Sequence, residues 1–256
     1  MPWRNLGCAA TLLAAMLAIP VAGAAGRAVY TIADAPARVL RGVTWYRLEP
    51  GASVENGDIV DAGEHGEVQL ELPQGEVLRI TGPALAYVTA LGSATGAHRA
   101  HEFTLLRGWF KLSDTPKGVP MVLTLPNAVV RVTDGIAVVH DDAARSEMFI
   151  ERGGATATAS AMRGRAAVHE TPEGEYWARE RTRVPTTDDR APRAFVTAMP
   201  PQLRDPLPIL VKRFDAPAPP LDAGRTINAE EAEPWLTGAT KSALARRLSH
   251  VGRREP

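Results

Sequence analysis

Few residues in this sequence have the types and spacing that catalysis or metal binding requires. His98 and His101 stand three residues apart with Glu102 beside the second histidine, and on a helix this spacing could hold a metal ion. The surrounding residues 92–100 are typical of a loop, and the sequence has no His-Glu-x-x-His motif. Residues 140–142 (His-Asp-Asp) are expected to end a strand and form a turn. The sequence therefore predicts no metal site and no cofactor.

Motifs for hydrolysis are equally scarce. Residues 92–96 (GSATG) lack the Gly-x-Ser-x-Gly spacing of a hydrolase nucleophile, and no Gly-x-x-x-x-Gly-Lys phosphate loop occurs. Glu67, Glu71 and Glu76 lie on an expected β-hairpin, where they alternate outward and are interpreted as a solvated face. The main interpretation is a protein that is not an enzyme. A pair of glycosidase carboxylates can be distant in sequence, so a polymer hydrolase remains an alternative.

Tryptophan offers a different chemistry, the binding of a sugar or a partner strand by aromatic rings. Trp45, Trp109 and Trp177 each stand next to a second aromatic residue in a strand-like segment. Consecutive residues of a strand point to opposite faces, so one ring of each pair is expected in the core. If the other face is solvated, the three tryptophans could form a binding platform; if it is covered, they are core residues. Trp235, beside a proline, is a fourth candidate binding residue, which would anchor the C-terminal part or dock a partner protein.

The elements that must position these residues are expected to be β-strands. Residues 67–72 alternate apolar and polar side chains, a turn follows at 73–75, and residues 76–81 alternate again, which predicts a hairpin. Asp58 is expected to accept backbone N–H bonds within its own turn, and Gly108 to mark a bulge or a close backbone approach. Further strands are expected at residues 38–47, 85–91, 103–106, 109–112, 122–125, 129–132, 136–139, 148–150, 165–169 and 175–178.

Many short strands that each bury one face predict an all-β fold. Two layers or a closed arrangement must cover the apolar sides, and the pattern fits a sandwich, a roll or a short β-solenoid. The 22 glycines and 21 prolines agree with short strands and turns rather than with a helical bundle. Basic and acidic residues are equal in number, 29 of each, which removes the usual electrostatic basis for binding nucleic acid or an anionic membrane.

The N-terminal residues 1–25 have the pattern of an export signal. Arg4 supplies a positive charge, residues 7–21 carry none, and small residues at 22–25 offer a cleavage site. Cys8 precedes the apolar stretch, which argues against lipidation, and its removal would leave a cysteine-free chain suited to an oxidising periplasm. We expect a periplasmic protein with no stable membrane span after cleavage of the signal peptide. An uncleaved inner-membrane anchor is the alternative.

The composition of the sequence changes near residue 180. Residues 26–180 contain the strand pattern and form the expected β domain. Residues 181–256 are rich in proline, and the stretch 216–220 (APAPP) is expected to be an extended spacer. Short amphipathic stretches on either side of this spacer could form helices. The predicted organisation is a signal peptide at 1–25, the β domain, and a proline-rich linker with a C-terminal helical extension.

The β pattern also resembles a known family. Residues 57–63 read Gly-Asp-Ile-Val-Asp-Ala-Gly, and residues 66–80 continue with an alternating strand, a turn and a second strand. Residues 103–110 and 121–139 supply further strand pairs in the same order. This succession resembles the FecR domain of bacterial envelope proteins.

The resemblance implies a protein that receives signals rather than a catalyst. The founding members of the FecR family regulate sigma factors, and their periplasmic FecR domain receives a signal from an outer-membrane transporter. They also have a cytosolic segment, for which an N-terminal export signal leaves no place, so anti-sigma activity is not expected here. This sequence departs from the family at Leu125, where threonine is usual, and at Asp134-Gly135, where Gly-Thr is usual.

We therefore expect an exported, FecR-like, non-enzymatic module for protein–protein contact or signal reception in the bacterial cell envelope. Its expected partner is an envelope protein and not a nucleic acid. One alternative is a module that binds a glycan, either peptidoglycan or an exported polysaccharide, through outward aromatic rings; buried tryptophans would remove that platform. The other alternative is an envelope-polymer hydrolase, which requires a cleft with converging carboxylates or histidines.

Overall fold

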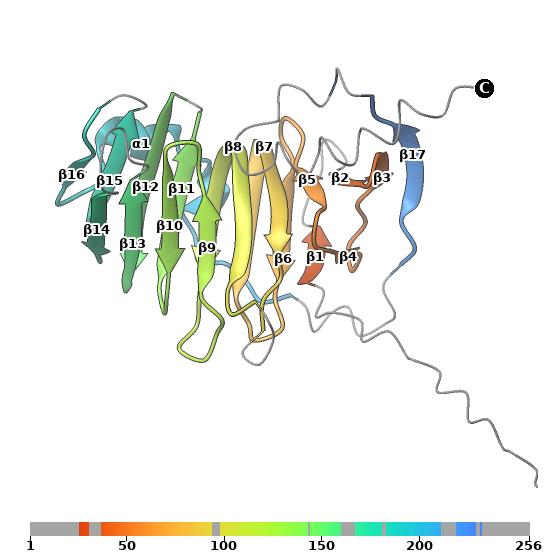
Figure 1. Ribbon diagram of the computed structural model, residues 1–256, viewed down its shortest axis with the longest axis horizontal. Helices are drawn as coiled ribbons and strands as arrows, with labels where there is room; N and C mark the ends of the chain where they lie inside the picture. The colour runs from red at the N-terminus through yellow and green to blue at the C-terminus, as the bar shows by residue number, and fades with distance from the viewer. Residues whose placement is uncertain are drawn as a thin grey trace, which may run out of the picture.

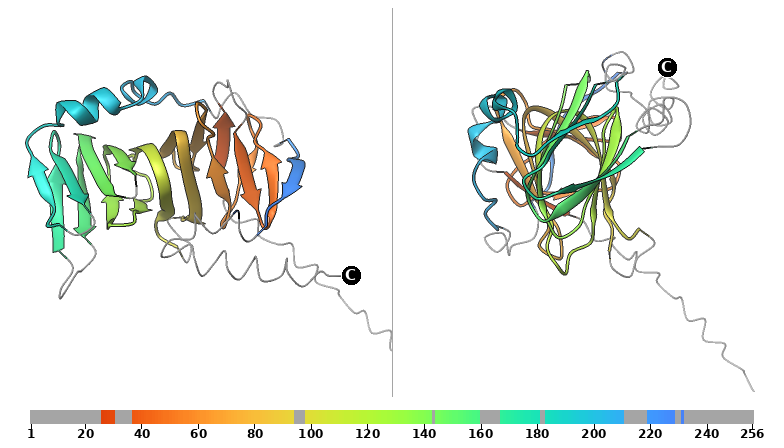
Figure 2. Two further views of the ribbon diagram at one scale, coloured as in Figure 1. Left: turned by 90° about the horizontal axis from the view of Figure 1, so that it is seen from above. Right: turned by 90° about the vertical axis from the view of Figure 1, so that its left-hand side faces the viewer.

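The computed structural model describes residues 26–30, 37–93, 98–142, 144–159, 167–180, 183–210, 219–228 and 231. These residues contain seventeen β-strands, one short α-helix and one 3-10 helix, which confirms the all-β prediction. The strands form one continuous sheet that folds over itself into two facing layers. The molecule is elongated, with its strands running across the long axis (Figure 1), and it has the outline of a roll when seen along that axis (Figure 2).

The order of the strands in each layer follows from their pairing. In spatial order, layer 1 consists of β4 (Ser53–Val54), β1 (Gly26–Tyr30), β6 (Glu67–Glu71), the first half of β7 (Val77–Ala90), the second half of β8 (His101–Ser113), β11 (Ile136–Asp141), β12 (Arg145–Arg152), β15 (Tyr176–Glu180) and β16 (Thr186–Asp188). Layer 2 consists of β17 (Asp222–Thr226), β3 (Thr44–Arg47), β2 (Arg38–Arg41), β5 (Ile59–Asp61), the other halves of β7 and β8, β9 (Met121–Thr124), β10 (Ala128–Val132), β13 (Gly154–Ala159) and β14 (Ala167–Pro172).

The long strands β7 and β8 belong to both layers because they bend in the middle. The register of their pairing shifts between Thr81 and Leu85, which marks the bend. Gly108 lies opposite this point with a φ of 107°, and a Cβ atom there would be 2.5 Å from the Cβ of Ala84. Only glycine allows the two backbones to approach so closely. The close approach predicted at Gly108 is confirmed, and it allows one hairpin to supply strands to both layers.

The main hydrophobic core fills the space between the layers. Alternate residues of each strand point inward, so that Phe103 and Leu105 from one half of β8 and Phe110 and Leu112 from the other half are fully buried. Inward residues of both layers join the same cluster. Removal of this apolar surface from water is the main term that stabilises the two-layer arrangement.

Residues 193–210 and 219–228, here called the C-terminal extension, contact both layers. The helices α1 (Arg193–Ala198) and η1 (Pro201–Leu203) lie on the outer side of layer 1 (Figure 2), and residues 204–210 continue along it. Strand β17 then pairs with β3 in layer 2. Among the described residues, no helix has the length and apolar character needed to cross a membrane.

Candidate binding site

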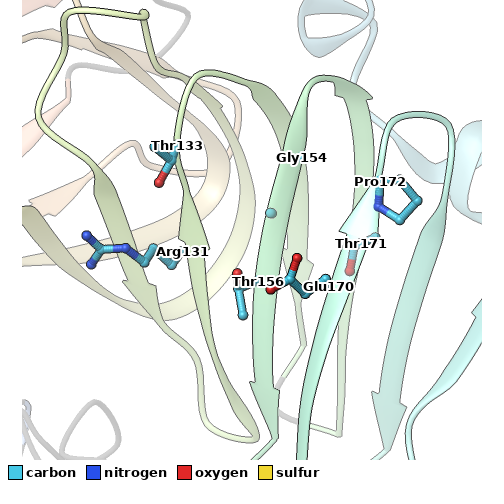
Figure 3. A pocket seen from close by; sticks show the side chains of 8 residues that line it. Arg131, Thr133, Gly154, Thr156, Glu170, Thr171 and Pro172 are labelled. Atoms are coloured by element: carbon cyan, nitrogen blue, oxygen red, sulfur yellow. The ribbon is translucent and has the colours of Figure 1, made fainter.

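A groove with a volume of about 480 Å³ crosses the outer side of layer 2 (Figure 3). Strands β10, β13 and β14 carry most of its lining. The volume falls in the usual range of ligand-binding pockets. The residues that line the groove are Arg131, Thr133, Gly154, Ala155, Thr156, Glu170, Thr171 and Pro172.

The strand register places two opposite charges across this groove. Arg131 on β10 pairs with Thr156 on β13, and Thr156 pairs with Glu170 on β14, so the three residues form one row. Adjacent strands are about 4.8 Å apart, which places the backbones of Arg131 and Glu170 about 10 Å apart. Ala155 and Ala157 are buried in the core, and therefore Thr156 between them points outward.

Both charges of this row are open to a ligand. Arg131 and Glu170 are exposed, and neither makes an ion pair with another described residue. Thr156 and Thr133 add hydroxyl groups to the lining. In the neighbouring row Val168 on β14 is 63% exposed. Charges of both signs, hydroxyl groups and an apolar neighbour are typical of the polar rim of a protein–protein interface.

The tryptophans predicted as binding residues lie elsewhere and are buried. Trp45, Trp109 and Trp177 are 3%, 7% and 0% exposed. Trp177 belongs to the core between the layers, whereas Trp45 and Trp109 belong to two separate apolar clusters on the outer sides. The structure therefore places the three rings apart from one another and forms no exposed platform from them. Trp235 lies outside the described residues.

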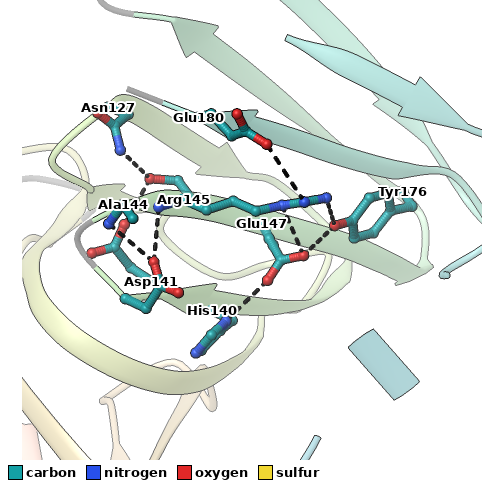
Figure 4. Close-up of polar contacts among 10 residues, drawn as sticks. Asn127, His140, Asp141, Ala144, Arg145, Glu147, Tyr176 and Glu180 are labelled. Carbon is teal, nitrogen blue, oxygen red and sulfur yellow. Dashed lines mark hydrogen bonds and ion pairs between the residues drawn. The ribbon is translucent and has the colours of Figure 1, made fainter. Parts of the chain in front are cut away.

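A second polar cluster lies on the outer side of layer 1 (Figure 4) and is centred on Glu147 of β12. The hydroxyl of Tyr176 donates to the Glu147 carboxylate, and Nδ1 of His140 lies 3.0 Å from it. Arg145 lies 3.2 Å from the same carboxylate and donates to the Tyr176 hydroxyl at 3.0 Å. Because these groups bond to one another, we interpret the cluster as a structural contact that joins β11, β12 and β15.

The Glu147 cluster also changes the acidity of its members. Burial opposes the ionisation of Glu147, but the hydrogen bonds from His140 and Tyr176 together with the charge of Arg145 outweigh it, and the pKa of Glu147 is lowered. Burial and the bond to Glu147 raise the pKa of Tyr176. Sequence patterns did not indicate this cluster, because His140 and Tyr176 come from strands far apart in the chain. The alternation of β11 and β12 gives only the side of the sheet on which each residue lies.

The prediction of a solvated face at Glu67, Glu71 and Glu76 is wrong. All three residues are buried, and each is at most 4% exposed. The C-terminal extension reaches this part of layer 1, where the Leu210 N–H donates to Glu71 at 2.7 Å. Glu76 instead accepts the N–H of Val119. Burial raises the pKa of Glu67, since the charged form loses its hydration.

His98 and His101, which stand three residues apart in the sequence, lie in different environments. His101 is fully buried in β8, and its Nδ1 accepts a hydrogen bond from the Gly92 N–H at 3.2 Å, whereas His98 is exposed. Within the part of the chain that the structure describes, no three His, Cys, Asp or Glu side chains gather in a way that could hold a metal ion.

Comparisons with known proteins give only partial likenesses. No protein-family model and no curated protein sequence matches this chain. Two crystal structures described as a candidate anti-sigma factor from Parabacteroides distasonis ATCC 8503 are similar to it, each with a TM-score of 0.42, and are 12% and 14% identical in sequence. Each likeness covers 52% of this chain and 59% of the other chain, so it spans less than two thirds of either protein.

Proposed function

We propose that this chain is an exported, FecR-like, non-enzymatic module that receives an envelope protein in the groove of layer 2. The observation that carries the proposal is the pair Arg131 and Glu170, two exposed and opposite charges on either side of one groove. A protein partner with an acidic and a basic group in the matching order would pair with both charges. Such a pair fixes the orientation of the partner and raises the rate of encounter.

A protein partner is preferred to a glycan for a specific reason. The tryptophan rings on which a glycan platform would depend, Trp45, Trp109 and Trp177, are buried. The groove itself is lined by charged, hydroxyl-bearing and small residues, and no aromatic side chain is among them. The periplasm as the place of contact is part of the proposal and rests on the sequence pattern of an export signal at residues 1–25, which lie outside the described residues.

The proposal is tested by photo-crosslinking in living cells. A photoreactive phenylalanine analogue replaces Thr156 at the centre of the groove, and the same analogue at the exposed residue Lys117 is the control. We expect a defined envelope protein to be joined to the chain at position 156 and not at position 117. Arg131→Glu is expected to lower the yield of this adduct by about tenfold, since like charges then meet in the groove.

A charge-swapped variant separates a specific contact from general attraction. Arg131→Glu together with Glu170→Arg keeps the net charge of the groove and reverses its order. An adduct that survives the swap, or no protein adduct at position 156, would contradict the proposal. Recovery of glycan instead of protein would support the glycan-binding alternative.

A further inference from the structure

The C-terminal extension covers the outer side of layer 1 with two different chemistries. Over one half, Phe195, Met199 and Leu203 of the extension pack against the apolar side chains of Trp109 and Val138. These contacts bury apolar surface on both partners. The burial of apolar surface therefore holds α1 and η1 on layer 1, as it holds the strands of the core together.

The surface beneath residues 204–210 is polar. Gln69 on β6, Arg79 on β7 and Lys111 on β8 are neighbours in one cross-strand row, and each is at most 7% exposed. Arg79 donates to the Gln69 side-chain oxygen at 2.8 Å, and Lys111 pairs with Glu151 at 2.7 Å. We call Gln69, Glu71, Arg79 and Lys111 the acceptor face, and residues 204–210 the strap.

Every side chain of the acceptor face bonds a main-chain atom of the strap or of η1. The bonds run from Arg79 to the carbonyl oxygen of Gln202 (3.2 Å), from Lys111 to those of Leu203 (2.8 Å) and Asp205 (3.0 Å), from Gln69 to that of Pro208 (2.7 Å), and from the Leu210 N–H to Glu71 (2.7 Å). These bonds reach atoms that any peptide possesses.

Most side chains of the strap point away from the acceptor face. Arg204 and Asp205 are exposed and Ile209 is 55% exposed, whereas Leu207 and Leu210 are half-buried. The Arg204 guanidinium donates to the carbonyl oxygen of Met199 within the C-terminal extension, and not to the acceptor face. Pro206 and Pro208 have no N–H group, so this segment cannot complete a regular strand ladder. The carbonyl oxygens of the strap instead accept hydrogen bonds from the side chains of Gln69 and Lys111. The acceptor face thus suits an extended backbone that contains prolines, with little demand on the other side chains.

We propose that the acceptor face is a docking site for an extended, proline-containing segment of a partner protein, and that the strap is a replaceable occupant. A charged surface remains compatible with water when the strap leaves, whereas the apolar surface under α1 does not. A partner segment would make the same main-chain bonds, so the exchange leaves no buried polar group unpaired. The acceptor face lies on layer 1 and the groove on layer 2, so either site can fail without the other.

The test uses the full chain and a fluorescent peptide with the sequence of residues 202–210, acetylated and amidated at its ends, as the stand-in for a partner segment. Pro206→Gly with Pro208→Gly increases the freedom of the undocked strap, which therefore occupies the acceptor face less of the time. We expect the peptide to bind this variant about tenfold more tightly than the unchanged chain, as measured by fluorescence anisotropy.

Two lysine substitutions in this background show whether the acceptor face is responsible. Lys111→Met is expected to abolish the gain in binding because two carbonyl bonds are lost, whereas Lys117→Met, at an exposed lysine, is expected to leave it unchanged. If Lys111→Met abolishes cooperative unfolding, Gln69→Ala is used in its place. In the glycine background this variant is expected to bind the peptide about tenfold more weakly than the glycine variant does. Equal binding to the glycine variant and the unchanged chain would overturn the proposal, as would undiminished binding to a folded acceptor-face variant.

A changed peptide tests recognition of the main chain directly. A peptide with Ile209→Ser should bind as the original does, since this side chain is more than half exposed in the strap. A peptide in which both prolines are glycine should bind about tenfold more weakly because it is less extended when free. Loss of binding on the serine change, or no effect of removing both prolines, would contradict recognition of an extended backbone.

Discussion

The indole ring of Trp109 lies flat against the imidazole ring of His140, with centroids 4.2 Å apart and planes inclined by 19°. Phe195 of α1 meets the same indole at 5.0 Å and the Tyr176 ring at 5.3 Å, in tilted and edge-on arrangements. Aromatic pairs favour such offset and edge-on geometries. The Phe195 ring therefore attaches the C-terminal extension to two strands of layer 1, β8 and β15.

Phe195→Ala should weaken the packing of α1 against this aromatic group. The substitution removes a buried ring, and we expect it to lower the free energy of unfolding by about 3–5 kcal/mol. Urea unfolding followed by circular dichroism measures the loss. Val196→Ala on the same helix is the matched control, because Val196 is 43% exposed and its change should have little effect. Equal losses for the two variants would contradict the role of Phe195.

Glu147→Gln should make stability less sensitive to acid. The pKa of Glu147 is lower in the folded protein than its usual value of 4.5. The ionised carboxylate therefore stabilises the fold at pH values above 4.5. This stabilisation is lost as the pH falls through the lowered pKa. We expect the unchanged chain to be more stable than the variant by about 1–3 kcal/mol near pH 7, and this difference should shrink below pH 4.5. Urea titrations across this range measure it, and a constant difference would contradict the assignment.

Gly108→Ala should disturb the bend shared by β7 and β8. The new Cβ would lie 2.5 Å from the Ala84 Cβ and 2.7 Å from the Pro83 carbonyl oxygen, at a φ that disfavours alanine. We expect a loss of about 2–5 kcal/mol in the free energy of unfolding. Gly174→Ala has a similar φ of 83° with no atom within 4 Å, so its loss should stay near 1–2 kcal/mol, about the backbone cost alone. Thermal and urea unfolding of both variants compare the two, and equal losses would show that crowding at Gly108 has no effect.

Arg131→Gln and Glu170→Gln should leave the stability of the fold unchanged. Both residues are exposed on the outer side of layer 2 and have no ion-pair partner among the described residues. We expect changes within about 0.5 kcal/mol, as is usual for surface positions. Melting curves of the two variants check this expectation. A large loss would mean that these charges serve folding, and would weaken the case for a binding role.

Local patterns in the sequence predicted several features correctly. Asp58 accepts the N–H of Glu55 within its turn at 2.8 Å, as expected, and is also bound by the Arg41 guanidinium. The hairpin expected at residues 67–81 appears as β6 and the first half of β7. These features depend on neighbours a few residues away, which is the range that alternation and turn chemistry describe.

Features that depend on distant parts of the chain were not predicted. The strands expected separately at 76–81 and 85–91 are one strand, β7, because Gly82 and Pro83 bend it instead of ending it. The cover over Glu71 comes from Leu210, which lies 139 residues later. The row from Arg131 to Glu170 requires the register of three strands. Alternation places each side chain on a face, but only tertiary pairing decides which charges meet there.

The shared hairpin of β7 and β8 also decides where the molecule can move. In a sandwich whose layers are joined only by loops, the two sheets can slide or part along their whole length. Here the two layers are joined through continuous strands at the bend, so their separation is fixed there. Local separation of the two layers should therefore increase with distance from the bend in β7 and β8, toward the ends of the roll. Amide hydrogen exchange should accordingly be slowest in β7 and β8 and fastest in β14, β16 and β17.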